Sequence, residues 1–291
     1  MIYIIRCKYL PKIAILLLMF ILLCISHTKL YSAVDTVANQ EDSIYLPIIM
    51  YHEVKPYKLG KDVISPYDFE SDLKYLQKHQ YNTITMTQLI HYIYGYGALP
   101  DNPIILSFDD GYLNNYRYVL PLLKKYNMKI VFSIIGKNTD DFTNIPDDNL
   151  DYSHVTWTQL AEMVNSGLVE VQNHTYNLHS NSNKRIGCMQ KSGESFEEYR
   201  QVLLEDIEKL QNKIDNHIGE IPNTFTYPYG KSSDETDIIL KEMGFKATLS
   251  CDYGLNLLTK NPDDLFGLKR IARSHSTSIA KILKGMPGSS R

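Results

Sequence analysis

The sequence lacks a second long apolar run beyond its first 25 residues, which excludes a chain that crosses the membrane many times. It also lacks an excess of basic residues, because 30 Lys and Arg stand against 33 Asp and Glu and leave a formal charge of -3. Without a domain-wide positive field, nucleic acid is not an expected partner. Hydrophobic residues make up 44% of the 291 residues, so a largely disordered chain is excluded as well.

The amino-terminal segment holds the one long apolar run. Three basic residues within the first 12 precede 13 uninterrupted apolar residues, Ile13 to Ile25. Since about 20 such residues span a bilayer, a cleaved signal peptide is favoured, and an uncleaved membrane anchor is the alternative. The basic flank directs the rest of the chain outwards. We expect residues 1–33 to be the leader or anchor, residues 34–45 a linker, and the protein to be secreted or held at the cell surface, with membrane contact only through this segment.

Cysteine and tryptophan are also scarce. Only Cys188 and Cys251 follow the leader, and the sequence alone does not place them within bonding distance. Tryptophan occurs once, whereas tyrosine occurs 22 times. Phenolic rings suit carbohydrate grooves, although tyrosines scattered over an ordinary fold are the alternative interpretation.

Beyond residue 43 the sequence alternates short apolar runs with amphipathic segments. The eight candidate strands are Leu46–Tyr51, Asn82–Met86, Pro103–Phe108, Lys129–Ile135, Leu168–Gln172, Asn223–Tyr227, Phe245–Ser250 and Leu268–Ala272. Helix signals lie between most of them, including a helix through His79 that begins at Ser65-Pro66. This alternation indicates a mainly parallel sheet, and the length fits one α/β barrel better than two domains. Two polar stretches, residues 138–153 and 180–193, are predicted to be loops.

Two adjacent carboxylates follow the candidate strand 103–108. Asp109 and Asp110 stand at its carboxyl end, before Gly111, which is where α/β enzymes place their catalytic groups. An Asp-capped turn before a helix from Tyr112 to Tyr126 is the alternative. The pair alone leaves both interpretations open.

Two histidines follow the candidate strand 168–172. His174 and His179 are five residues apart, which would separate them by about 140° on a helix and place them on opposite faces of a strand. A turn or loop could bring them together. Two imidazoles and one carboxylate with an open position are typical of a catalytic divalent metal site, and unrelated surface histidines are the alternative.

Taken together, these residues resemble one family. Ser107–Gly111 (SFDDG), His174–His179 (HTYNLH) and Thr226–Gly230 (TYPYG) are similar to the first three motifs of the polysaccharide deacetylases, the carbohydrate esterase family 4 or NodB-homology group. Leu46–His52 resembles the opening strand of many bacterial members. The order and spacing of these motifs are specific, and the resemblance covers nearly the whole exported part of the chain.

The resemblance implies a distorted (β/α) barrel of about seven to eight strands in a single domain, residues 46–285, followed by a tail, residues 286–291. It also implies a divalent metal, commonly Zn2+ with Co2+ or Ni2+ as alternatives, that is held by Asp110, His174 and His179. A metal lowers the pKa of its bound water and polarises the acetamide carbonyl, so the neighbouring Asp109 would act as general base.

The third motif is expected to supply the oxyanion donor. By resemblance, the backbone N–H of Tyr229 would hold the tetrahedral oxyanion, with Pro228 and Gly230 as its rigid and permissive neighbours. An ordinary turn after a strand is the alternative. Many family members place an arginine three residues before this tyrosine, where it orients the base, but Thr226 occupies that position here.

Two further histidines are candidate site residues. His275 follows the candidate strand 268–272 and could be the general acid that protonates the departing amine, or a surface residue. His52 follows the first strand and could line the same barrel mouth in a supporting or substrate-binding role, or simply pack there.

We therefore expect a metal-dependent hydrolase that removes N-acetyl groups from N-acetylglucosamine residues of a cell-wall or surface polysaccharide. The five-residue histidine spacing and Thr226 favour the bacterial poly-N-acetylglucosamine and peptidoglycan deacetylase branch. An O-acetyl esterase of the xylan type using the same site, and a catalytically silent glycan-binding surface protein, are the alternatives. We expect a monomer whose partner is the polysaccharide.

Overall fold

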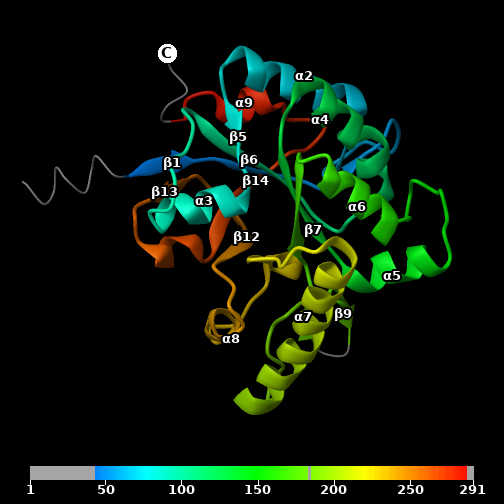
Figure 1. Ribbon diagram of the computed structural model, residues 1–291, viewed down its shortest axis with the longest axis vertical. Coiled ribbons are helices and arrows are strands. Elements are labelled where there is room, and N and C mark those ends of the chain that lie inside the picture. Colours follow the sequence, from blue (N-terminus) through cyan, green and yellow to red (C-terminus); the bar gives the residue numbers. More distant parts are fainter. Residues whose placement is uncertain (1–42, 183–184, 287–291) are drawn as a thin grey trace, which may run out of the picture. The chain divides into compact units, whose positions relative to one another are not determined.

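Seven parallel strands close into a barrel in the computed structural model, which describes residues 43–182 and 185–286. Their order around the barrel is β2 (Ile48–Tyr51), β14 (Leu268–Ala272), β12 (Ala247–Tyr253), β11 (Thr224–Thr226), β8 (Val169–Asn173), β7 (Ile130–Ile134) and β6 (Pro103–Phe108), which pairs back to β2. An eighth strand, β5 (Asn82–Thr83), pairs with the start of β6. The predicted single-domain α/β barrel is confirmed (Figure 1).

Three pairs of short strands lie outside the barrel. They are β1 (Ile44–Leu46) with β13 (Asn256–Leu258), β3 (Glu53–Val54) with β4 (Val63–Ile64), and β9 (Asn181–Ser182) with β10 (Arg185–Ile186). The expected leader, most of the linker and all but the first residue of the tail lie outside the described residues. Within the described ranges, no helix is long and apolar enough to cross a bilayer.

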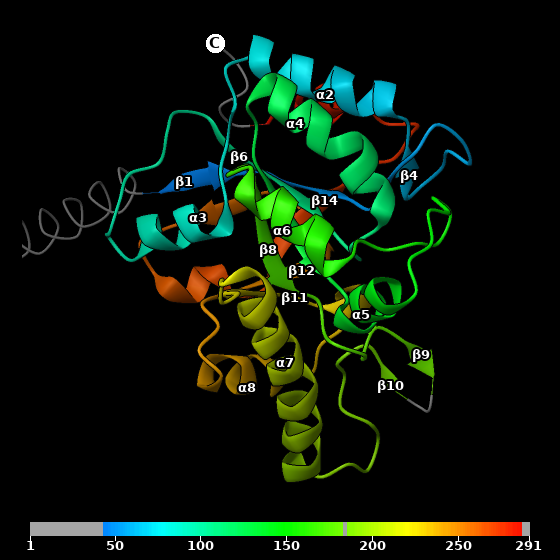
Figure 2. The ribbon, with the colours of Figure 1, turned by 45° about the vertical axis from the view of Figure 1, so that its right-hand side comes forward.

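Helices connect the strands. They are α2 (Pro66–Lys78), α3 (Met86–Ile93), α4 (Leu120–Tyr126), α5 (Gly136–Asn144), α6 (Trp157–Asn165), α7 (Phe196–Ile218), α8 (Thr236–Glu242) and α9 (Ile279–Leu283). Four of them begin at a capping box, in which a Ser or Thr side chain accepts the N–H of the third helical residue: Ser65, Thr85, Thr156 and Ser195. Both ribbon views place α2 beside α4 (Figure 2).

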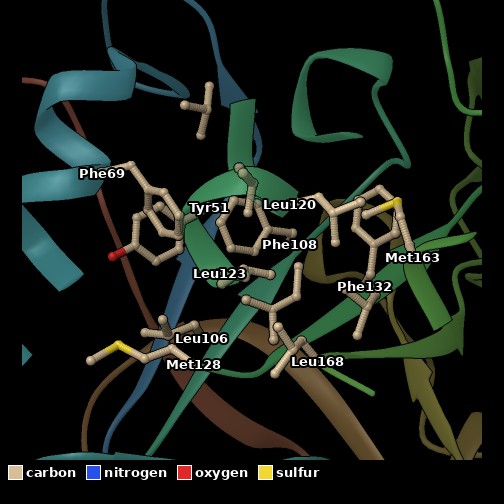
Figure 3. Packing of buried hydrophobic residues seen from close by; sticks show 14 of the residues in the cluster. Tyr51, Phe69, Leu106, Phe108, Leu120, Leu123, Met128, Phe132, Met163 and Leu168 are labelled. Carbon is tan, nitrogen blue, oxygen red and sulfur yellow. The ribbon is translucent and has the colours of Figure 1, made fainter. Parts of the chain in front are cut away.

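The largest apolar cluster fills the space between the barrel and these helices. Tyr51 of β2 stacks on Phe108 of β6 with ring centroids 4.8 Å apart, and Phe69 of α2 meets both rings edge-on at 5.5 Å (Figure 3). Because strand side chains alternate between two faces, the residues between these outward ones point into the barrel.

The barrel interior changes character along its axis. Apolar residues such as Ile105 and Val131 belong to a second cluster nearer the amino ends of the strands. One inward position further along, Ser107 of β6 accepts a hydrogen bond of 3.4 Å from Arg270 of β14, and Ser133 of β7 lies 2.7 Å from Thr226 of β11 across the intervening strand. The carboxyl end of the barrel is therefore polar, as a catalytic face requires.

Three local predictions were wrong. Residues 138–144 are not loop but belong to α5. The first N–H groups of this helix, those of Gly136 and Lys137, donate to the carbonyls of Thr175 and Tyr176 and not to a capping side chain. The strand expected over 82–86 ends at Thr83, because the Thr85 capping box starts α3 at Met86. Residues 180–193, also expected to be loop, contain the short strands β9 and β10. The helix expected over Tyr112 to Tyr126 is present from Leu113 onwards, with a π-helical turn, Asn115–Val119, before α4.

Candidate active site

Three predicted metal ligands converge at the carboxyl end of the barrel. Oδ1 of Asp110 lies 3.5 Å from Nε2 of His174 and 3.3 Å from Nε2 of His179. The three side chains bring ligand atoms within 4.8 Å of one another. The structure therefore brings together a pair of histidines that no regular helix or strand with this spacing could bring together.

The local backbone explains how these residues meet. Asp110 follows β6 with a φ of 72°, in the left-handed region, and Gly111 continues the turn with a φ of 83°. His174 follows β8 directly, and His179 lies at the end of the irregular segment that comes next. Both loops leave the same edge of the barrel, because parallel strands place their carboxyl ends together.

The donor set fits a divalent metal. Oδ1 of Asp110 is buried and has no hydrogen-bond partner within the described residues, which is costly for a carboxylate oxygen unless a cation binds it. Nδ1 of His174 lies 2.7 Å from the carbonyl oxygen of Thr226, so Nδ1–H donates and Nε2 turns its lone pair to Asp110. One carboxylate and two imidazoles are a ligand set that leaves a coordination position open for water or substrate.

The two imidazoles differ in basicity. Burial disfavours the charged form of His174, but Asp110 and Asp109 outweigh burial and raise its pKa. For His179, burial and the neighbouring His174 lower the pKa to about 4. The pKa of Asp110 lies below its ordinary value, because the histidines outweigh the effect of burial. A metal would bind this set with both imidazoles neutral.

Asp109 lies beside the ligand set and is held by an arginine that the sequence did not reveal. Nη1 of Arg270, on β14, donates to Oδ1 of Asp109 at 2.8 Å, and Nε donates to the carbonyl of Ser250 at 2.6 Å. Asp109 and Arg270 are 2% and 1% exposed, so the ion pair is buried. Burial alone would raise the pKa of Asp109, but Arg270 and His174 outweigh it and keep the carboxylate ionised.

Arg270 makes the contact with Asp109 that the family resemblance leads us to expect from an arginine at the position of Thr226. Here the guanidinium comes from another strand, β14. The one available signal was an arginine within the otherwise apolar run Leu268–Ala272.

The third motif adopts the tight turn that the sequence suggested. Tyr229, with a φ of 58°, lies in the short 3-10 segment Pro228–Gly230, and its ring centroid is 4.5 Å from that of His179. Gly230 has a φ of 64°, and a Cβ there would lie 2.4 Å from Cβ of Cys251. Glycine is therefore required where this turn passes β12. Cys251 and the buried Cys188 are both free thiols.

The two additional histidines lie in different surroundings. The imidazole of His52 is close enough to lower the pKa of both Asp109 and Asp110, after the larger effects of burial, Arg270 and His174. The imidazole of His275 is about half exposed, and its Nδ1 lies 2.8 Å from Oδ2 of Asp68 on α2. The structure thus brings His52 to the site, whereas the contact of His275 is with a helix outside the barrel.

An aromatic side chain flanks the carboxylates on another side. Tyr112 follows Gly111 and stacks on His154 with ring centroids 4.7 Å apart. Burial and then the charge of Asp110 raise the pKa of Tyr112, so its hydroxyl stays protonated beside the site. Tyr112 and Tyr229 place two of the many tyrosines next to the predicted ligands.

The chain is similar to several known proteins. The model of the family described as polysaccharide deacetylase matches residues 96–248. A poly-beta-1,6-N-acetyl-D-glucosamine N-deacetylase of Staphylococcus aureus (strain MSSA476) is 27% identical over 220 residues, which are 74% of this chain and 67% of that protein. A solved de-N-acetylase from Aggregatibacter actinomycetemcomitans is 27% identical with a TM-score of 0.70, covering 82% of this chain and 98% of that one. IcaB from Ammonifex degensii is also 27% identical, with a TM-score of 0.66 and coverage of 80% and 93%.

Proposed function

This chain belongs to the polysaccharide deacetylase family and is an enzyme that removes acetyl groups from a polysaccharide, and we propose that its substrate is a poly-N-acetylglucosamine outside the cell. The single observation that carries the proposal is the meeting of Asp110, His174 and His179, with Asp109 held beside them by Arg270. A purely glycan-binding protein would have no use for a buried base and three convergent metal donors.

Asp110, His174 and His179 would hold a divalent metal, for which we propose Zn2+. When bound, the metal supplies a Lewis acid that polarises the acetamide carbonyl and activates water for attack. Both imidazoles and a carboxylate favour a metal of this class, and Co2+ or Ni2+ would satisfy the same donors.

Asp109 is the proposed general base. As water attacks the acetamide carbon, the carboxylate accepts the proton, and Arg270 keeps that carboxylate ionised and oriented. The backbone N–H of Tyr229 donates to the developing oxyanion, with Pro228 and Gly230 fixing its direction. The C–N bond then breaks, which leaves acetate and a free amine on the sugar.

The departing amine needs a proton, and we propose His52 as its donor. The imidazole of His52 lowers the pKa of both carboxylates, whereas that of His275 is paired with Asp68. His52→Ala should lower kcat for acetate release by about 10²-fold or more, and His275→Ala should change it little. The reverse result would transfer the general-acid role to His275.

A surface polysaccharide as substrate is supported by the relatives' names, the near-neutral charge and the apolar leader. The Staphylococcus aureus and Aggregatibacter actinomycetemcomitans relatives, an N-deacetylase and a de-N-acetylase, point to the N-deacetylase branch. A formal charge of -3 is compatible with an uncharged acetylated polymer, and residues 1–33 would carry the enzyme out of the cell or tether it there. Freed amines would make the polymer cationic.

A glycan panel separates this proposal from its rivals. Acetate release should be measured on β-1,6-linked N-acetylglucosamine oligomers, peptidoglycan and acetylated xylan, before and after chelation, with Zn2+, Co2+ and Ni2+ added back. We expect release from the first substrate that chelation abolishes and Zn2+ restores. Release only from xylan would identify an O-acetyl esterase, and stoichiometric metal without release from any substrate would indicate a silent glycan-binding protein.

A further inference from the structure

The segment from His174 to His179, called the histidine loop below, is strained at its start. Thr175 has a φ of 70°, a conformation that β-branched side chains avoid. Its side chain is fully buried. Such a backbone persists only where surrounding contacts over-determine it, so the contacts of this loop identify what holds the two proposed ligands in place.

Asp206, on α7, binds the middle of the histidine loop. Its Oδ1 accepts the backbone N–H of Tyr176 at 2.7 Å, and its Oδ2 accepts that of Asn177 at 2.8 Å. Hydrogen bonds to an ionised acceptor are about twice as strong as neutral ones. Burial raises the pKa of Asp206 to about 6 against the opposing effect of these two bonds and of Lys209, so the fold keeps this carboxylate here despite its desolvation.

Tyr176 is held by both neighbouring helices. Its hydroxyl donates to Oδ2 of Asp140 on α5 at 2.9 Å, and its backbone carbonyl accepts the N–H of Lys137 at 2.8 Å. From α7, the ammonium of Lys209 lies 3.8 Å from the centre of the ring. The residue between the two ligands is therefore fixed through its backbone, its ring and its hydroxyl.

The start of α5 is shaped to fit the same loop. The N–H of Gly136 donates to the carbonyl of Thr175 at 3.1 Å. A Cβ at Gly136 would lie 2.8 Å from Cδ2 of Tyr176 and 3.4 Å from its Cα, so only glycine lets the helix approach this closely. Helix and loop pack here without room for another side chain.

From these contacts we propose that Asp206 and Tyr176 form a clamp on the histidine loop that sets the divalent-metal affinity of the site. His174 is fixed independently, because it follows β8 and its Nδ1–H bonds to Thr226. His179 is five residues further along and reaches Asp110 only if the loop between them keeps its conformation. Both clamp residues are positioning residues, and the inference rests on the ligand set of the proposed function.

Metal affinity, measured apart from activity, tests the clamp. Asp206→Asn preserves the size of the side chain but turns an amide N–H2 towards one of the two loop N–H groups. We expect Zn2+ and Co2+ to bind about 10- to 100-fold more weakly in competition with a chromophoric chelator, as for other groups that orient metal ligands. The matched control is Asp215→Asn, an exposed position on the same helix, which should bind metal like the unaltered chain.

Two further measurements separate positioning from folding. The unfolding temperature of the metal-free Asp206→Asn chain should not fall in step with its metal affinity, and saturating Zn2+ should restore most of its kcat. Tyr176→Phe removes only the bond to Asp140 and keeps the ring and the backbone donors, so we expect a smaller weakening, about threefold. The visible spectrum of bound Co2+ should change in both variants, because it reports ligand geometry.

The outcomes distinguish the clamp from the ligand set. If the unaltered chain binds one metal, His174→Ala abolishes binding and both clamp variants bind as tightly as the unaltered chain, the clamp is overturned and the ligand set stands. An unaltered chain that binds no metal overturns the ligand set, and the clamp with it. Weakened binding in both clamp variants but not in Asp215→Asn supports the clamp.

Discussion

Two buried arginine–aspartate pairs lie on opposite sides of the barrel wall, and their arginines come from β14 and from the residue that follows it. Arg270 points inwards and makes one hydrogen bond to Asp109 at 2.8 Å. Arg273, just beyond the strand, binds both oxygens of Asp72 on α2, at 2.7 and 3.0 Å, and Asp72 also accepts bonds from Tyr51 and the backbone of α9. The outer pair is fully satisfied by structural partners, whereas the inner pair leaves its aspartate beside the metal donors.

The difference between the pairs extends to their charges. Around Asp72, burial outweighs Arg273 and raises the pKa. Around Asp109, burial also acts to raise the pKa, but Arg270 and His174 together outweigh it and lower the pKa. The bidentate pair with many bonds joins α2 and α9 to the barrel. The inner pair makes one bond and lies beside the ligand set, so under the proposed function similar residues serve stability in one place and catalysis in the other.

The largest expected effect on folding is at the outer pair. Arg273→Met leaves Asp72 buried without its cation, so we expect the free energy of unfolding to fall by about 3–5 kcal/mol in urea denaturation. Acetate release per folded molecule should stay unchanged. The control is Arg117→Met at an exposed pair with Asp148, where the loss should be below about 1 kcal/mol. An equal fall in the free energy of unfolding in the two variants would contradict the structural role of Arg273.

Of the two pairs, the inner one is expected to have the larger effect on activity. Arg270→Met releases the carboxylate of Asp109 from its orientation, so kcat for acetate release by the folded fraction should fall by about 10²-fold with little change in KM. Arg270→Lys keeps the charge but loses the planar donors that also bind Ser250, and about a tenfold loss is expected. Full activity in Arg270→Met would show that the base needs no positioning group.

Asp206 extends the comparison, because it is a third desolvated carboxylate, and its hydrogen bonds come from backbone N–H groups instead of an arginine. Its pKa is raised to about 6, so the folded state favours the protonated form more than the unfolded state does, although the group is still mainly ionised at pH 7. The stability that this group contributes is fully present below about pH 4 and is lost as the pH rises through 6. Urea unfolding with chelator present should show this loss, about 2–3 kcal/mol between pH 4 and 7, in the unaltered chain but not in Asp206→Asn. Parallel pH curves would contradict the assignment.

The parts of the structure that the sequence revealed are those encoded by local pattern. Strands such as Pro103–Phe108 and Leu268–Ala272 were predicted with their observed bounds, because continuous apolar runs mark buried parallel strands. Asp110, His174 and His179 were recognised because each lies in a short motif that is legible in the local sequence.

The missed parts depend on partners distant in the sequence. Arg270 binds a carboxylate 161 residues away, and Asp206 binds backbone groups 29 and 30 residues away. The polar start of α5 was interpreted as loop because the acceptors of its N–H groups come from the histidine loop rather than from a capping side chain. The composition of a short sequence window does not predict contacts between residues so far apart in the sequence.

One measurement tests the central claim most directly: the number of Zn2+ ions bound per chain and the rate of acetate release, determined on the same samples of unaltered protein, Asp109→Asn and Asp110→Ala. We expect one ion and full activity in the first. Asp109→Asn should keep the ion but lose activity by about 10²- to 10⁴-fold, and Asp110→Ala should lose both. Stoichiometric metal in Asp110→Ala, or near-normal acetate release from Asp109→Asn, would contradict the division of the two adjacent carboxylates into ligand and base.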